Sequence, residues 1–148
     1  MGRRNFLFLV ISVVVTGAGS QTAAADGPPP FVVVVNAKNP SFVVDRDFVA
    51  DAFLKKTTRW PNGDVIKPVD QTSSSPTRAR FSEAILKRSV SAVKSYWQQI
   101  IFSGRDVPPT EVASDEDVIK FVAAHPGAIG YVSGSTPLGE TRAATVRQ

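Results

Sequence analysis

The hydrophobic positions in the first half of the chain alternate between strand-like and helix-like patterns. Residues 31–36 form a nearly continuous β-branched run, which is typical of a strand buried on both faces. Residues 46–54 repeat apolar side chains at helical spacing, and Asp45 stands where the N-cap of that helix is expected. Residues 65–70 predict a second strand, which Pro68 weakens or places at a sheet edge because proline lacks a backbone donor.

The next part of the chain predicts two helices in succession. The first begins at Pro76 or Thr77 and extends to about Lys87. The second follows Ser89, which is placed to cap it, and carries an apolar stripe that includes Trp97. Since aromatic side chains dominate burial in small domains, we expect Trp97 to lie in the core.

A further helix and two strands are predicted near the end of the chain. Ser114 and Asp117 resemble a capping box, with Asp in place of the usual Glu, and residues 125–127 (His-Pro-Gly) end the helix that follows. Residues 128–132 predict a third strand, and residues 141–146 a marginal fourth. This order of elements indicates an α/β fold in which helices pack on a small mixed β-sheet.

The first residues have the pattern of a secretory signal peptide. Arg3 and Arg4 precede the apolar run 6–15, and residues 23–25 (Ala-Ala-Ala) match an A-x-A-like cleavage site. The apolar run is shorter than a membrane span, so an uncleaved anchor is the less favoured alternative. We therefore expect a signal peptide over 1–25, a Pro-rich linker over 26–30, a domain over 31–148, and a periplasmic or secreted location.

Composition limits the classes of function. The 123 residues that would remain after cleavage suffice for one α/β domain, and the absence of cysteine means that this domain folds without disulfides. Removing Arg3 and Arg4 lowers the formal net charge from +4 to +2, and the remaining basic residues form no run of five or more. Nucleic acid is therefore not expected as a partner.

The segment 70–81 carries the candidate chemistry. Five of the six residues from Thr72 to Thr77 bear hydroxyl groups, and the predicted helix begins beside them. Helix starts offer unpaired N–H groups that attract anions, and Arg78 and Arg80 add positive charge nearby. The alternative is that Thr77 is an N-cap and the serines form a solvated loop.

Three motifs in fixed order resemble the periplasmic phosphate-binding proteins of ABC transporters. They are residues 34–40 (VVNAKNP), 53–60 (FLKKTTRW) and 126–132 (PGAIGYV). In that family a strand ending V-N-x-x-N-P precedes a helix ending F-x-G-K-I-T-x-W, and N-P-G-A-I-G-Y-V forms a late strand. The resemblance covers about residues 31–133 and implies a single lobe of a periplasmic-binding-protein-like fold.

The resemblance also implies a ligand loop. The family's loop resembles R-S-x-G-S-G-T, so Ser75 and Thr77 match its ligand-contacting Ser and Thr, whereas Gln71 stands in place of arginine and Pro76 in place of glycine. Glutamine lacks the charge and the planar fork of donors of arginine, and proline removes an N–H, so each change weakens a phosphate site. The predicted ligand-binding residues are Ser75, Thr77, Gln71, Ser74 and Arg78.

Two classes of non-enzymatic function follow. The first is an exported solute-binding module that binds phosphate or a related oxyanion weakly. The second is a partner-binding or sensor component of the cell envelope that has lost the phosphate site; its partner would be an ABC transporter membrane component, another envelope protein or a second copy. No cofactor, metal site or catalytic residue is predicted, and His125, the only histidine, is expected to pair with carbonyls at a helix end.

The signal-peptide prediction is tested by the N-terminus of the protein recovered from its native cell envelope. We expect mass spectrometry to find Asp26, or a residue within about three positions of it, at the N-terminus, because the cleavage site follows the Ala-x-Ala pattern. Recovery of a chain that begins at Met1 from the cytosol would contradict export.

Overall fold

The structure is a computed structural model that describes residues 27–148. The predicted signal peptide over 1–25 lies outside the described residues. Residues 27–30, from the predicted linker, are exposed. Within the described part of the chain, no helix combines the length and apolar character needed to cross a membrane.

The described residues form seven short strands and five helical segments. In chain order these are β1 (Val32–Asn36), β2 (Val43–Asp45), α1 (Arg46–Phe53), β3 (Lys67–Gln71), α2 (Pro76–Phe81), the π-helix η1 (Ser82–Leu86), α3 (Val90–Phe102), β4 (Thr110–Val112), α4 (Asp115–Ala124), β5 (Ala128–Val132), β6 (Thr141–Ala143) and β7 (Thr145–Arg147).

Five of the strands form one mixed sheet in the order β4-β3-β5-β1-β6. β3 runs parallel to β4 and β5, whereas β1 runs antiparallel to β5 and β6. Pro68 lies where β3 pairs only with β5, because the pairing with β4 begins at Val69. β3 is therefore an internal strand, and the expected edge placement is wrong. Pro68 is tolerated because it lies at the end of β3 where no strand pairs on the β4 side.

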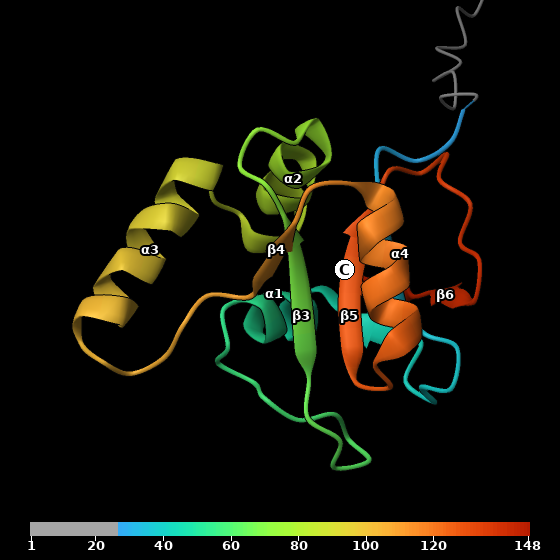
Figure 1. Ribbon diagram of the computed structural model, residues 1–148, viewed down its shortest axis with the longest axis horizontal. Helices are drawn as coiled ribbons and strands as arrows, with labels where there is room; N and C mark the ends of the chain where they lie inside the picture. The colour runs from blue at the N-terminus through green and yellow to red at the C-terminus, as the bar shows by residue number, and fades with distance from the viewer. Residues whose placement is uncertain (1–26) are drawn as a thin grey trace, which may run out of the picture.

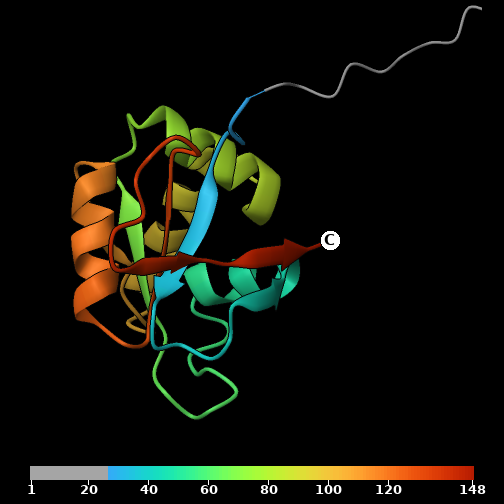
Figure 2. The same ribbon diagram turned by 90° about the vertical axis from the view of Figure 1, so that its right-hand side faces the viewer.

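Helices cover both faces of this sheet, as the two orthogonal views show (Figure 1, Figure 2). α4 covers one face, where Val34 and Val69 of the sheet pack against Val118 and Val122. α1, α2, η1 and α3 belong to the other face, and their core includes Phe53, Phe81, Trp97 and Tyr131. The predicted α/β fold with helices on a mixed sheet is confirmed, and so is the burial of β1 on both faces.

Gly130 sets how closely α4 approaches the sheet. A Cβ atom at this position would lie 2.7 Å from Val118 Cγ1 and 2.8 Å from Val69 Cγ1, closer than real Cβ contacts. The absence of a side chain thus lets the helix valines touch the centre of β5.

Three serines cap the N-termini of helices through the same contact. The hydroxyl oxygens of Ser75, Ser89 and Ser114 accept hydrogen bonds from the N–H groups of the third helical residues, at 3.1–3.2 Å. The caps predicted at Ser89 and Ser114 are confirmed. At α2 the N-cap is Ser75 rather than Thr77, because Pro76 occupies the first helical position and Thr77 the second.

Asp45 occupies the N-cap position of α1, but its side chain makes no capping hydrogen bond. Instead its carboxylate pairs with Arg147 of β7 at 2.9 Å. The predicted side-chain cap is wrong, since the carboxylate points to the neighbouring strand of the small parallel sheet β2-β7.

The helix expected to extend from Pro76 or Thr77 to Lys87 changes its hydrogen-bonding pattern at Ser82. From there η1 follows π-helical geometry to Leu86, and Lys87 caps its end with a φ of +54°. Ser82 holds this end, since its hydroxyl donates to Arg88 O at 2.7 Å. The change leaves two consecutive side chains, Ile85 and Leu86, both buried.

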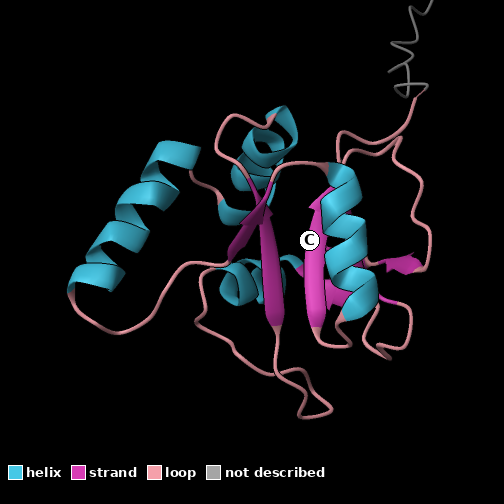
Figure 3. Cartoon of the chain, viewed as in Figure 1, coloured by secondary structure: helices cyan, strands magenta, loops and turns pink. Residues whose placement is uncertain are grey.

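The short strands differ most from the sequence pattern. The strand predicted over 141–146 is split at Ala144 into β6, which pairs with β1, and β7, which pairs with β2. β2 and β4 were not predicted, because three residues are too few to show periodicity. Figure 3 shows β4 as a short strand beside β3 and β6 as the small arrow at the right of the view.

Replacement of Trp97 tests the burial of α3. Trp97 is 5% exposed, so Trp97→Ala is expected to lower the free energy of unfolding by about 3–5 kcal/mol, as large-to-small core changes do. Phe102→Ala on the same helix is the matched control, because Phe102 is 92% exposed and should change stability by less than about 0.5 kcal/mol. Equal urea-unfolding midpoints for Trp97→Ala and the wild type would contradict this packing.

Candidate functional site

The candidate site lies where β3 and β5 end side by side. Because the two strands run parallel, their carboxyl ends meet at one edge of the sheet, the usual place for ligands in such sheets. The loop 72–75 leads from β3 to α2 at this edge, and α4 begins next to it (Figure 1). Four predicted ligand residues, Gln71, Ser74, Ser75 and Thr77, lie in or beside this loop.

Ser75 is fully engaged with neighbouring groups of the chain. Its hydroxyl donates to Gln71 Oε1 at 2.6 Å and accepts from Arg78 N at 3.2 Å. A serine hydroxyl has a single hydrogen to donate. That hydrogen is held by Gln71, so in this conformation Ser75 has no donor for a ligand.

Gln71 is 3% exposed, and its amide is also committed. Nε2 donates to Asp115 Oδ1 at 2.7 Å and to Tyr131 O at 3.0 Å. A glutamine amide carries two hydrogens, and both are used in these contacts. Gln71, which stands where the resembled phosphate-binding family has arginine, therefore joins the end of β5 to the start of α4.

Asp115 places a carboxylate of the chain itself in the loop region. Besides Gln71, it accepts hydrogen bonds from Ser133 N at 3.1 Å and from Thr136 Oγ1 at 2.7 Å. The carboxylate also lies in the first turn of α4, where the helix dipole favours negative charge. The side-chain amide of Gln71, the backbone N–H of Ser133 and the hydroxyl of Thr136 thus all donate to the Asp115 carboxylate.

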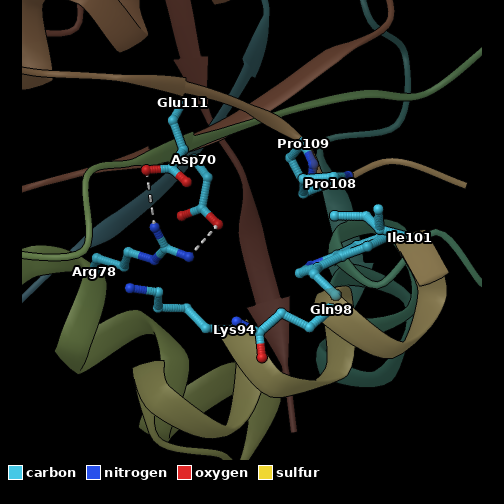
Figure 4. A pocket seen from close by; sticks show the side chains of 9 residues that line it. Asp70, Arg78, Lys94, Gln98, Ile101, Pro108, Pro109 and Glu111 are labelled. Carbon is cyan, nitrogen blue, oxygen red and sulfur yellow. Dashed lines mark ion pairs between the residues drawn. The ribbon is translucent and has the colours of Figure 1, made fainter.

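Arg78 is held below the loop by a buried ion pair. Its side chain is 6% exposed, and Nη2 lies 3.4 Å from Asp70 Oδ2. Nη1 donates to Gln71 O at 2.7 Å and lies 3.3 Å from Glu111 Oε1 (Figure 4). The guanidinium is therefore engaged with Asp70, Glu111 and the carbonyl of Gln71, so in this conformation it does not supply the charge that arginine gives the loop of the resembled family.

Asp70 is the second partner in this pair and has two further donors. Gln71 N donates to its carboxylate at 3.0 Å, and the hydroxyl of Tyr131 makes a very short contact with the same oxygen. Burial raises the pKa of the Asp70 carboxyl, while the nearby Arg78 charge and these two hydrogen bonds oppose the shift. Burial also raises the pKa of the Tyr131 hydroxyl, so the tyrosine remains a neutral donor.

The remaining predicted residues take up different positions. Thr77 is buried in the first turn of α2, whereas Ser74 is exposed at the tip of the loop. Arg80 is exposed as well. His125 lies away from the loop and donates Nδ1–H to Phe121 O at 2.8 Å, which confirms its expected pairing at a helix end. In the described residues, no group of three or more His, Cys, Asp or Glu side chains could hold a metal ion.

The sequence pattern did not indicate Asp70, Glu111, Asp115 or Tyr131 as part of the site. Gln71 and Asp115 are 44 positions apart, and Asp70 and Tyr131 are 61 apart. One local signal was available: the polar pair Asp70-Gln71 ends β3 directly after the apolar residues Pro68 and Val69. Polar residues at the carboxyl end of an inner strand commonly face a site.

Comparison with known proteins supports the fold. No protein-family model matches the chain, and no curated protein matches it in sequence. Among solved structures, one from Clostridium perfringens, described as a phosphate ABC transporter substrate-binding protein with bound phosphate, matches with a TM-score of 0.63 and 20% identity. An ABC-type phosphate transport receptor from Vibrio cholerae gives 0.61 and 21%, and PstS from Borrelia burgdorferi gives 0.59 and 13%.

These matches cover 79–80% of this chain but only 44–47% of the matched chains. The chain thus spans less than half the length of the solved proteins it resembles. At these identities the similarity establishes the fold rather than a shared ligand. The chain has the fold of one lobe of the phosphate ABC transporter substrate-binding proteins.

Proposed function

We propose that this protein is an exported, non-enzymatic binding lobe that acts through contact with another protein of the cell envelope. The partner would be an ABC transporter membrane component or a separate envelope protein. The signal-peptide pattern of residues 1–25 supports export, and the similarity to substrate-binding proteins supports a binding role without catalysis.

The observation that carries this proposal is the closed hydrogen-bond network around Gln71. Ser75 donates to Gln71, Gln71 donates to Asp115, and Arg78 donates to Gln71 O. An oxyanion would have to displace these contacts and approach the Asp115 carboxylate. Bringing two anions together in a partly buried site costs several kcal/mol at the effective dielectric of about 20 typical of proteins.

A second candidate is weak binding of phosphate or a related oxyanion by the same loop. The exposed hydroxyl of Ser74 and the matched positions of Ser75 and Thr77 favour it. Binding would require Ser75 to turn away from Gln71. The two candidates therefore differ in whether the loop opens when phosphate is added.

Titration calorimetry with phosphate separates the two candidates. We expect no saturable heat for the wild-type chain up to about 10 mM phosphate, above the millimolar range where a weak site of about −4 kcal/mol saturates. The double variant Gln71→Arg with Asp115→Asn removes the Asp115 carboxylate and adds a charged guanidinium with several N–H donors. We expect this variant to show saturable phosphate binding within the same concentration range, since charge-assisted hydrogen bonds contribute about 1.5–3 kcal/mol each.

Gln99→Arg is the matched control for the added charge, because Gln99 is exposed on α3, away from the loop. It should leave phosphate binding unchanged. Saturable binding by the wild type that Ser75→Ala abolishes would overturn the proposal in favour of oxyanion capture.

Replacement of Arg78 tests whether the buried pair holds the closed loop. Arg78→Ala leaves the Asp70 carboxyl buried without its cation, so we expect the free energy of unfolding to fall by about 3–5 kcal/mol. The matched control is Arg80→Ala, two residues further along and exposed, with an expected change of less than about 0.5 kcal/mol. Chemical denaturation measures both. A loss as small for Arg78→Ala as for Arg80→Ala would mean that the pair contributes nothing to the fold.

A further inference from the structure

Exposed apolar side chains gather at the end of α3. In residues 27–148 the exposed large hydrophobic residues are Val43, Val65, Ile101, Phe102 and Val107. Three of these lie between positions 101 and 107, and Phe102 is 92% exposed. Scattered exposed apolar residues are normal, but a cluster that contains an aromatic ring marks an interaction surface. We call residues 87–107 the α3 surface.

The α3 surface carries a net positive charge, because its one acidic residue, Asp106, is paired with Lys55 at 3.4 Å. Residues 84–105 contain four cationic side chains and no Asp or Glu. The four are Lys87, Arg88, Lys94 and Arg105. None of them forms an ion pair with any residue in the described part of the chain. These charges remain available for acidic groups of another molecule.

A recess of about 160 Å³ adjoins the apolar cluster and separates α3 from β4. Ile101, Pro108 and Pro109 form one wall, and Lys94 lies on the opposite side near Arg78 (Figure 4). Arg78 is already paired with Asp70 and Glu111, whereas Lys94 is not paired. Asp70 and Glu111 also line the recess, but both carboxylates are paired with Arg78. Among the lining residues, Lys94 is therefore the cation left for an entering carboxylate, and Ile101 offers apolar surface beside it.

We propose that the α3 surface binds an acidic segment of a protein partner, with a carboxylate at Lys94 and an apolar side chain against Ile101 and Phe102. This assignment rests on the proposed function and names the chemistry of the partner. The chemistry matches the composition of protein interfaces, in which a few aromatic anchors lie within a rim of polar and charged groups.

Two other occupants fit the surface less well. In a symmetric dimer the same patch would face itself, so the unpaired cations of one copy would oppose those of the other. For a bilayer, α3 offers little apolar area, because Val93, Trp97 and Ile100 are already buried in the core. Neutral polar residues such as Gln98 and Gln99 occupy much of the face that remains exposed.

The test uses the full chain in its native cell envelope with the photo-crosslinking residue p-benzoylphenylalanine in place of Phe102. We expect it to form an adduct with one protein, and mass spectrometry should locate the crosslinked segment next to Asp or Glu residues. The matched control carries the same residue at Val65, which is exposed to 50% but lies outside the α3 surface, and should give no such adduct. Thermal unfolding of each variant checks that it folds.

Charge reversal then tests the contact itself. Lys94→Glu in the Phe102 crosslinking background should lower the adduct yield about tenfold, because it sets like charges against each other. Replacing the facing Asp or Glu of the identified partner with Lys should restore the yield. Lys120→Glu, on the distant helix α4, is the control and should leave the yield unchanged.

Three results would overturn the assignment: adducts with phospholipid, adducts with a second copy of the chain, or a protein adduct whose yield is insensitive to Lys94→Glu. Each is distinguishable from failure of the proposed function, which phosphate calorimetry measures at the loop 72–75. If the chain bound phosphate and still formed the charge-dependent adduct, the α3 surface would stand as a partner-binding site. Only the proposal that the loop 72–75 is closed to phosphate would be wrong.

Discussion

The buried ion pair between Asp70 and Arg78 is the contact on which the candidate site depends. It joins the end of β3 to the first turn of α2, and the same two side chains also contact Glu111 of β4 and Tyr131 of β5. Buried charges are tolerated only when they are paired and hydrogen-bonded, so the positions of these four elements are coupled. The loop 72–75, which lies between the paired residues, takes its conformation from this constraint.

The coupling decides what the loop can offer to a ligand. Because Arg78 is turned toward Asp70, the backbone of Gln71 is fixed, and its side chain reaches Asp115 and Ser75. The side-chain donors of Ser75 and Gln71 are satisfied within the chain: Ser75 donates to Gln71, and Gln71 donates to the Asp115 carboxylate of α4. A fold similar to that of phosphate-binding proteins is thus combined with a loop whose Gln71 and Ser75 side chains bond to other groups of the chain.

Much of the fold was predictable because it depends on local patterns. The valine run of β1, the serine caps of α3 and α4 and the burial of Trp97 each follow from residues close together in sequence. Whether the five residues predicted to bind a ligand do so stays a prediction.

The network around those residues could not be read from the sequence, because it joins positions far apart. Nothing near Gln71 indicates Asp115, and nothing near Asp45 indicates Arg147. The π-helical turn at Ser82 and the three-residue strands β2 and β4 have no periodic signal at all. Residues close together in sequence therefore predict most helices and strands, whereas the contacts of the candidate site depend on residues far apart in sequence.

The place of β1 in the sheet has a consequence for how the chain folds. β1 is the first strand, yet its partners are β5 and β6, so that Val32 pairs with Val132 and Val34 with Ala143. Pairing of such distant residues pays a large loop-closure entropy and slows folding. The sheet cannot close until nearly all of the domain has been made, so the growing chain lacks its central strand pairing. During synthesis from the N-terminus, β1 therefore stays without both of its partner strands until residues 128–143 have been made.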